Sequence, residues 1–383
     1  SYAAHWSYIG ETGPYFWPNL DLGSSTPNEC GGKYQSPVDI NERYTDYDGN
    51  MGPLRFNNYH RALKSPIIVN NGHTAMVSGT PDREVYVEGN SLSGKYQFAQ
   101  LHFHWGANSS RGSEHTFSGT TYPLEMHLVH FNQNYGSAPQ AMKRRDGFLV
   151  IAVLFEISRD NNPNFQTIVD ALSRVRSEEA NGVELPNPVV LNDLLPAISS
   201  EYYRYNGSLT TPPCSQAVIF NILTNTVPIS EQQMEQFRQL RAGSQDESPL
   251  LVDNYRPVLP LNGRQVFRSF PSASTPLFRP TEGATSLSGF EDDLFDALAE
   301  AGFADGNKDL LGAGVAVQRV GDLIRDCDYY RFQPNWANYR RLCDPVWRGV
   351  LDIEDYTSER LPFIVTSVAS DTPAYQYGLL RKK

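Results

Sequence analysis

The sequence predicts a β-dominated α+β protein. From residue 54 to residue 157, short runs of alternating apolar and polar residues recur between turn signals, as is typical of half-buried strands. Asn-Gly, Gly-Asn and Pro-Asp pairs separate the runs, where a chain reverses between strands. Long segments of helical period are few. The runs that we expect to form strands cover residues 67–70, 84–88, 96–105, 122–131 and 148–156.

Two helices are predicted later in the chain. Residues 164–177 carry apolar side chains at the spacing of one helix face. Residues 230–240 begin with Ser230 as a helix N-cap, and Gln233 stands at the position that completes a capping box. From residue 250 to residue 270 the chain returns to extended segments.

A stretch rich in Pro, Ser and Thr predicts a linker over residues 271–287, which separates residues 1–270 from a C-terminal extension of unknown function over 288–383. A hydrophobic content of 40% with 12% aromatic residues is ample for a packed core. The formal net charge of -11 argues against a nucleic-acid surface. No apolar run reaches the ~18 residues of a membrane span. The dense basic triplet Lys143-Arg144-Arg145 is interpreted as a solvated loop.

Two segments concentrate histidine at strand spacing. In a strand, residues two apart share a face, so His102 and His104 point the same way. In the second segment His127 and Val129 share a face, and His130 lies on the other. If the strands are neighbours, His102, His104 and His127 converge. Three neutral imidazoles are the ligand set of a catalytic zinc with an open fourth position; the alternative is three ordinary histidines on a half-buried sheet.

Polar neighbours of these histidines fit an outer layer of the same site. Ligating histidines usually donate their second N–H to a carboxylate, amide or carbonyl group. Gln100 lies on the strand face of His102, and Glu125 lies on that of His127. Read singly, either residue is equally compatible with a solvated polar position.

The chain has four cysteines, Cys30, Cys214, Cys327 and Cys343. An even number suits two disulfides, and four cysteines can be paired in three ways. The N-terminus shows no charged segment followed by an apolar one, which leaves a cytosolic protein or a mature chain whose signal peptide has been removed. Asn108 and Asn206 stand in acceptor triplets for N-glycosylation.

Several separated motifs, in this order, resemble the alpha-class carbonic anhydrases over residues 1 to about 270. They are Gln35-Ser36-Pro37-Val38-Asp39-Ile40, Asn70-Asn71-Gly72-His73, His102-Phe103-His104-Trp105-Gly106, Ser113-Glu114-His115, Glu125-Met126-His127-Leu128-Val129-His130, Gly207-Ser208-Leu209-Thr210-Thr211-Pro212-Pro213-Cys214 and Val252-Asp253-Asn254-Tyr255-Arg256-Pro257. The resemblance implies a large, twisted, mostly antiparallel sheet with peripheral helices and a zinc ion at the bottom of a conical cleft. The extension has no counterpart in the family core.

The resemblance also implies an extracellular type of chain. In extracellular members, cysteines at the places of Cys30 and Cys214 are paired, which leaves Cys327 and Cys343 for a second bridge. Disulfides indicate an oxidising compartment. We therefore expect a secreted, glycosylated protein whose signal peptide has been removed.

The implied reaction is the reversible hydration of carbon dioxide to bicarbonate and a proton. A zinc ion held by His102, His104 and His127 would lower the pKa of its water to about 7, which supplies hydroxide. By resemblance, Thr210 and Glu114 orient that hydroxide, and Thr211 contacts the substrate or bicarbonate. An apolar wall for carbon dioxide is assigned to three residues, the first by strand phase and the others by resemblance: Val129, Val150 and Leu209.

A histidine can accept and release a proton near neutral pH. His73 matches the proton shuttle of the family, with Asn71 and Tyr8 lining the water path. His115 and His130 are interpreted as structural. The chain departs from the family pattern at Phe220, where tryptophan is usual, and at Asn206, where proline is common.

A second hypothesis keeps the same fold without making catalysis its role. The chain would then be a binding protein, or an extracellular matrix protein of mineral deposition, that uses residues 288–383 for a matrix partner or for self-association. The presence of the three ligand histidines together with His73, Glu114 and Thr210 favours the enzyme.

Overall fold

The structure, a computed structural model, describes residues 6–23, 26–178, 182–245 and 247–271. The extension over 288–383, the linker beyond residue 271 and the expected Cys327–Cys343 bridge lie outside the described residues. Within the described part of the chain, no helix is long and apolar enough to cross a bilayer.

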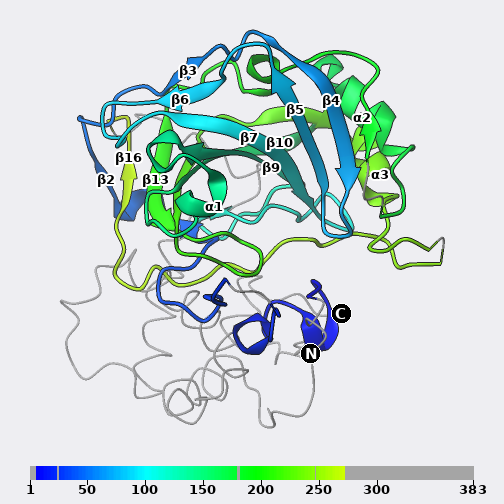
Figure 1. Cartoon of the computed structure of the whole chain (residues 1–383), viewed down its shortest axis with the longest axis horizontal. Helices are drawn as coiled ribbons and strands as arrows, with labels where there is room; N and C mark the ends of the chain where they lie inside the picture. Colours follow the sequence, from blue (N-terminus) through cyan, green and yellow to red (C-terminus); the bar gives the residue numbers. More distant parts are fainter. Residues whose placement is uncertain (1–5, 24–25, 179–181, 246, 272–383) are drawn as a thin grey trace, which may run out of the picture. The chain divides into compact units, whose positions relative to one another are not determined.

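A 14-stranded sheet organises the described residues (Figure 1). Its strands are β2 (Thr45–Tyr47), β3 (Arg55–Asn57), β4 (Ala62–Asn70), β5 (Ala75–Pro81), β6 (Tyr86–Glu88), β7 (Tyr96–Trp105), β9 (Leu124–Asn132), β10 (Phe148–Ser158), β11 (Val183–Glu184), β12 (Val189–Val190), β13 (Tyr202–Gly207), β14 (Val218–Leu223), β15 (Val227–Ser230) and β16 (Val266–Arg268). A separate two-stranded sheet pairs β1 (Asp39–Ile40) with β8 (Thr116–Phe117).

The main path of the large sheet runs in the order β11-β4-β5-β7-β9-β10-β14-β13-β16-β2. Most neighbours are antiparallel, among them β7 with β9 and β9 with β10. Parallel pairing is confined to β10 with β14 and β15, β16 with β2, and the small β1–β8 sheet. The expected large, mostly antiparallel sheet is therefore confirmed.

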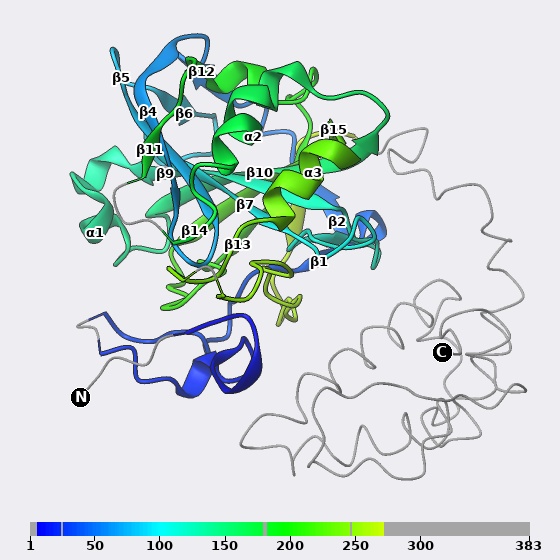
Figure 2. The ribbon, with the colours of Figure 1, turned by 90° about the vertical axis from the view of Figure 1, so that its right-hand side faces the viewer.

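Helices lie at the periphery. They are α1 (Ala138–Ala141), α2 (Gln166–Leu172) and α3 (Glu231–Arg238), with short 3₁₀ helices at Gly10–Thr12, Trp17–Asn19, Glu42–Tyr44, Gln133–Tyr135, Pro163–Phe165 and Leu191–Leu194. Helices α2 and α3 pack side by side against the sheet (Figures 1 and 2). The predicted capping box of Ser230 and Gln233 begins α3. The predicted helix over 164–177 stops at Leu172, because the next turns tighten into i→i−3 hydrogen bonds from Arg174 and Val175.

The two faces of the central strands β7, β9 and β10 differ. One face carries fully buried apolar side chains that pack beneath α2 and α3, including Leu101, Phe103, Met126, Leu128, Ile151 and Val153. The opposite face carries the histidines at the alternate positions, because successive side chains of a strand point to opposite sides. Burial of the apolar face, at roughly 25 cal/mol per Å², fixes the register that places the polar face.

The N-terminal segment is fastened to the domain near its C-terminal strands. Trp17 is fully buried against Cys30 and Cys214, and its indole N–H lies 3.0 Å from the carbonyl oxygens of Ser7 and Thr12. Cys30 and Cys214 form a disulfide, which confirms that expectation. The bridge joins residues 184 positions apart and so holds the segment beside the loop that follows β13.

Candidate metal centre

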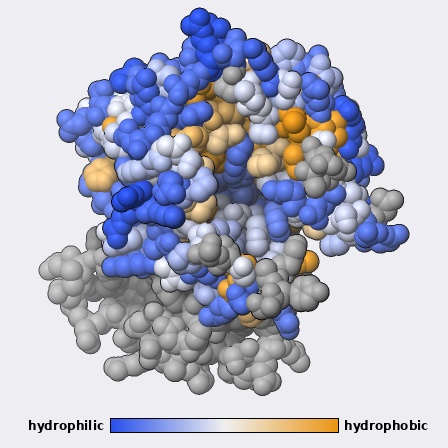
Figure 3. Space-filling view, in the orientation of Figure 1, coloured by the Kyte–Doolittle hydropathy of each residue, from blue (hydrophilic) through white to orange (hydrophobic). Residues whose placement is uncertain are grey.

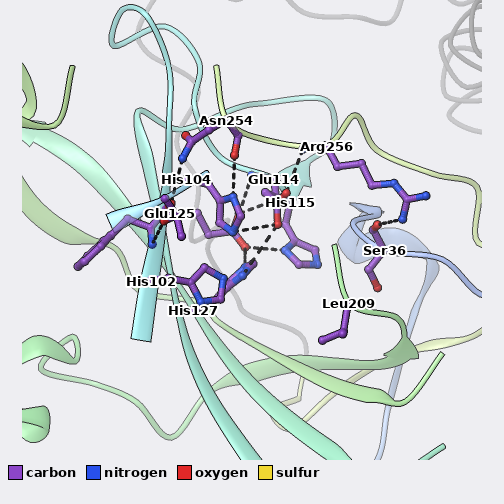
Figure 4. A network of polar contacts seen from close by, with 12 residues as sticks. Ser36, His102, His104, Glu114, His115, Glu125, His127, Leu209, Asn254 and Arg256 are labelled. Atoms are coloured by element: carbon purple, nitrogen blue, oxygen red, sulfur yellow. Dashed lines mark hydrogen bonds and ion pairs between the residues drawn. The ribbon is translucent and has the colours of Figure 1, made fainter. Parts of the chain in front are cut away.

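Three imidazoles converge on the polar face of the sheet (Figure 4). His102 and His104 come from β7, and His127 comes from β9. The antiparallel register pairs His102 directly with His127. One ring nitrogen from each histidine lies within 4.8 Å of the others. The period of two and the pairing of the strands together bring the rings to one point.

Hydrogen bonds fix which nitrogen of each ring faces the centre. His102 Nδ1 donates to Gln100 Oε1 at 2.9 Å, and His127 Nε2 donates to Glu125 Oε1 at 2.7 Å. These contacts leave His102 Nε2 and His127 Nδ1 facing the centre. Because the other nitrogen of each ring donates a hydrogen bond, the ring is held in the tautomer that can bind a metal.

His104 is held by Asn254, for which no role was predicted from the sequence. Its Nδ1 donates to the main-chain oxygen of Asn254 at 2.8 Å, so Nε2 faces the centre. The Asn254 amide accepts from Trp105 N–H at 2.7 Å and donates to the carbonyl oxygen of His73 at 3.0 Å. Asn254 belongs to the motif Val252-Asp253-Asn254-Tyr255-Arg256-Pro257. Any residue can accept a hydrogen bond through its main-chain oxygen, so the sequence does not predict this contact.

Two buried acceptors face each other at this point. His104 Nε2 and Glu114 Oε2 lie 3.3 Å apart, and neither atom has a hydrogen-bond partner among the described residues. The other carboxylate oxygen, Glu114 Oε1, accepts from the main-chain N–H of Arg256 at 2.9 Å. A neutral imidazole nitrogen and a carboxylate oxygen both carry lone pairs, so their closeness fits a centre that receives a cation.

The pKa directions of His102 and His104, two of the three histidines, favour the neutral form. Burial holds the pKa of His102 well below its ordinary value, with His104 and His127 adding to the effect. Burial also lowers the pKa of His104. For His127 burial acts downward, but its hydrogen bond to Glu125 and the charge of that carboxylate raise the pKa overall. Neutral imidazole is the form that coordinates zinc.

Glu125 stabilises more than one side chain of the site. Its Oε2 accepts from the main-chain N–H groups of Glu114 and His115, both at 2.8 Å, and its Oε1 also accepts from His115 Nδ1 at 2.7 Å. Burial acts upward on the pKa of Glu125, but His115 and His127 outweigh it and hold the pKa well below its usual range. The carboxylate therefore stays ionised in the interior.

The departure at Phe220 lies directly beside these rings. Its ring centroid is 4.9 Å from that of His115 and 5.5 Å from that of His127, and it stacks on Tyr205 with an interplanar angle of 9°. Tyr205 hydroxyl lies 2.7 Å from His115 Nε2. Phe220, at the position where tryptophan is usual, therefore packs against His115 and His127 of the metal centre.

The residues assigned to the apolar wall come from two strands and one loop. Val129 on β9 and Val150 on β10 are cross-strand partners, and both are buried. Leu209 follows β13 and is half-buried (Figure 4). The face of the molecule seen in Figure 1 is hollowed near its middle, with apolar groups along the upper border and polar groups in the depth (Figure 3).

Thr210 and Thr211 lie on the loop that the disulfide anchors. Thr210 is buried, Thr211 is half-buried, and Thr211 accepts a main-chain hydrogen bond from Cys214 N–H at 2.8 Å. Within the described residues, no hydrogen bond joins Thr210 to Glu114. The orientation of a nucleophile by this pair stays a prediction.

The residues assigned to proton transfer lie at a neighbouring turn. The His73 ring stacks on Trp6 with centroids 3.6 Å apart. Asn71 Oδ1 accepts from the main-chain N–H of His73 at 3.0 Å, so Asn71 shapes the turn that presents the imidazole. The Tyr8 hydroxyl is buried; burial raises the pKa of Tyr8 well above its usual value, and the charge of Glu114 adds to this.

His130 and the two glycosylation triplets lie away from the three histidines. His130 points to the opposite face of β9, where its Nδ1 donates to the carbonyl oxygen of Leu149 at 3.1 Å. Asn108 and Asn206 are both exposed.

A β-sheet on which three imidazoles converge beside a buried carboxylate is typical of metalloenzymes with three histidine ligands. More particularly, residues 12–270 match the family model of the eukaryotic-type carbonic anhydrases, and the chain belongs to this enzyme family. Members of this family hydrate carbon dioxide and require zinc.

Named relatives agree with the family model. The chain is 35% identical to carbonic anhydrase 3 of Homo sapiens over 271 residues, which are 70% of this chain and 99% of the relative. It is 39% identical to carbonic anhydrase 7 of Mus musculus over 270 residues, or 69% and 97% of the two chains. It is 36% identical to carbonic anhydrase 12 of Homo sapiens over 272 residues, or 69% and 73%.

Proposed function

We propose that this chain is a zinc enzyme that reversibly hydrates carbon dioxide to bicarbonate and a proton, with His102, His104 and His127 as the metal ligands. One observation carries the proposal. In each ring one nitrogen donates a hydrogen bond and the other is left as an acceptor. The three acceptor nitrogens lie within 4.8 Å of one another beside Glu114 Oε2, which has no hydrogen-bond partner among the residues that the structure describes. Such a donor set fits zinc.

The role of the surrounding residues follows from their contacts. Zinc held by three neutral imidazoles supplies Lewis acidity, which lowers the pKa of water to about 7 and makes a nucleophile available at neutral pH. Gln100, Glu125 and Asn254 each hold one imidazole by its second nitrogen. Fixed tautomers and ring directions preorganise the ligands, so little reorganisation accompanies metal binding.

Carbon dioxide is uncharged and needs no ionic contact. We assign Val129, Val150 and Leu209 to the apolar wall against which it lies, because two of them form a buried cross-strand pair adjacent to His127. Thr211 is assigned to contact with substrate or bicarbonate. Thr210 and Glu114 are assigned to orienting the nucleophile, since Glu114 Oε1 is fixed by Arg256 N–H while Oε2 keeps an acceptor toward the centre.

The reaction releases a proton that must reach solvent. His73 is assigned to this transfer because its imidazole is only half-buried and an imidazole exchanges protons readily near neutral pH. Tyr8 and Asn71 are assigned to the path. The buried Tyr8 hydroxyl near Glu114 and the Asn71 contact to the His73 turn support this assignment.

The proposed setting is extracellular. The Cys30–Cys214 bridge supports an oxidising compartment, and the exposure of Asn108 and Asn206 is compatible with glycosylation. We retain the division into a domain over 1–270, a linker over 271–287 and an extension over 288–383, supported by the family match to residues 12–270. The matrix or binding role rested on the extension, and it is not proposed here.

Metal content and oxygen exchange test this function together. We compare the full chain with His104→Ala and with His60→Ala, a histidine on an exposed turn. The parent and His60→Ala are expected to hold about one zinc per chain and to exchange ¹⁸O between carbon dioxide and water. His104→Ala is expected to lose both properties. Full zinc content in His104→Ala would contradict the ligand assignment, and parent protein with zinc but without exchange would contradict the reaction.

A further inference from the structure

We propose that a second site, a basic cavity whose lining includes none of the three histidines, binds a compact organic polyanion. The cavity has a volume of about 590 Å³. Its lining residues come mainly from the loop between α1 and β10, the end of β13 and the segment before β16; Figure 1 labels these elements. Its cationic members are Lys143, Arg144, Arg145 and Arg264. None of the residues assigned to the metal centre lines it.

The charge of the lining is positive although the chain is acidic. Four cationic side chains stand against two carboxylates, Glu29 and Asp146, in a chain of net charge -11. Both carboxylates accept hydrogen bonds from neutral donors. Glu29 Oε2 accepts from the main-chain N–H and the side-chain amide of Gln216, and Asp146 accepts from Ser93 and Tyr135 hydroxyls, both at 2.6 Å.

The cations of the triplet, in contrast, have no salt bridge within the described part of the chain. The Arg145 guanidinium lies 5.9 Å from the ring centroid of Tyr34, and that of Arg144 lies 5.6 Å from Tyr135. Contacts with aromatic rings hold the direction of a guanidinium and leave its N–H edge available. Lys143, Arg144 and Arg145 are exposed, as expected for a solvated loop, and they also line this cavity.

The loop that carries the triplet has a fixed conformation. Arg144 N–H donates to the carbonyl oxygen of Ala141 at 2.9 Å, and Gly147 N–H donates to that of Arg144 at 3.0 Å. A Cβ at Gly147 would lie 1.8 Å from the Ala141 oxygen, so only glycine permits this close turn. A loop whose backbone is already ordered loses less conformational entropy when its side chains bind an anion.

The opposite wall is equally well held. Arg264 donates to main-chain oxygens of Gln35, Asn206, Pro260 and Leu261 at 2.7–3.0 Å. Its guanidinium lies 6.0 Å from the Tyr34 centroid, on which Lys33 also stacks at 5.4 Å. Tyr34 thus gathers cations from separate segments, and it is a half-buried part of the lining.

Size and chemistry define the ligand class. Pockets for organic ligands span roughly 300–1,000 Å³, so this cavity exceeds the need of a single inorganic ion. Arginine recognises sulfate, phosphate and carboxylate groups with paired N–H donors. The exposed side chain of Asn206, when it carries no glycan, adds an amide suited to hydroxyl groups. A sugar-like frame with several sulfate or phosphate groups has this combination of properties.

Titration calorimetry on the zinc-loaded full chain tests the site. The probes are sucrose octasulfate, inositol hexakisphosphate, inorganic sulfate and, as the uncharged frame, sucrose. The test variant is the triple change Lys143→Gln, Arg144→Gln, Arg145→Gln. The matched control removes the same charge at exposed positions elsewhere, by Lys64→Gln, Arg83→Gln and Arg159→Gln. Tyr34→Leu probes the cavity without changing charge.

The triple variant is expected to weaken binding of at least one polyanion by tenfold or more, Tyr34→Leu by threefold or more, and the control by less than twofold. Hydration of carbon dioxide should stay unchanged in all three. A preference for octasulfate or hexakisphosphate identifies the anionic group. Equal losses in the test and control triples would overturn the proposal in favour of diffuse electrostatics. Equal affinity for inorganic sulfate, or binding of sucrose alone, would overturn the ligand class.

Discussion

His104 Nε2 faces Glu114 Oε2 across 3.3 Å in the interior of the domain, and both atoms are acceptors without a hydrogen-bond partner among the described residues. Two buried lone pairs at this distance are unfavourable unless a positive charge lies beside them. The pair therefore connects metal binding with the stability of the domain, and it gives a test that does not depend on catalysis.

We predict opposite effects of Glu114→Gln on stability and activity. The amide of glutamine can donate to His104 Nε2 while its oxygen keeps the hydrogen bond from Arg256 N–H. Metal-free Glu114→Gln should thus be more stable than metal-free parent by about 1 kcal/mol. Hydration by the zinc-loaded variant should fall. Urea unfolding of both apoproteins measures the first effect, and a metal-free variant less stable than the parent would contradict it.

His73, whose ring stacks on Trp6, is the residue assigned to proton transfer, and this assignment leads to a prediction. Replacing His73 by alanine should slow turnover at low buffer concentration by ~100-fold or more, the usual contribution of a positioned proton donor or acceptor. Zinc content should not change. Added imidazole should restore much of the rate, and His60→Ala serves as the control. Unchanged turnover in His73→Ala at low buffer would remove His73 from the mechanism.

The buried pair of His130 and Tyr59 predicts acid sensitivity. His130 Nδ1 donates to Leu149 O, and its Nε2 lies against the Tyr59 hydroxyl. Burial lowers the pKa of His130 to about 4, whereas an unfolded histidine titrates near 6.5. Between these values only the unfolded chain takes up the proton. The free energy of unfolding should therefore decrease as pH falls through this window, by roughly 3 kcal/mol in all.

His130→Gln tests this dependence because the amide can replace both hydrogen bonds without titrating. Urea unfolding at pH 7 and pH 5, with saturating zinc in every sample, should show that the parent loses roughly 2 kcal/mol more than the variant. Equal losses would mean that His130 does not contribute to the acid response.

The Cys30–Cys214 disulfide should stabilise the domain substantially. It closes a loop of 184 positions, and long loops lose the most entropy on cross-linking. Reduction should lower the free energy of unfolding by about 2–5 kcal/mol. The double variant Cys30→Ala, Cys214→Ala should be equally destabilised and should not respond to reductant. If the urea midpoint of the parent is the same with and without reductant, the bridge contributes nothing.

Much of the fold could be predicted from periodicity. The bounds of β7 agree with the predicted run, whose apolar residues Tyr96, Phe98, Leu101, Phe103 and Trp105 are all buried. The convergence of His102, His104 and His127 follows from the same period of two. The helix over 164–177 was predicted too long, since an apolar stripe does not reveal where i→i−3 hydrogen bonds replace helical ones.

Other features could not be predicted because they depend on distant contacts. Asn254 holds His104 through a main-chain oxygen, which any residue possesses. The basic cavity unites Glu29, Arg145 and Arg264, which strand pairing and the disulfide-held segment bring together. Neither local composition nor spacing contains that information.

The most direct test of the central claim is stopped-flow hydration of carbon dioxide as a function of zinc content. The full chain is stripped by a chelator and reconstituted to graded zinc occupancy, and metal and rate are measured on the same samples. The account predicts a rate that rises in proportion to bound zinc and saturates at about one ion per chain. Full zinc occupancy without hydration would contradict it.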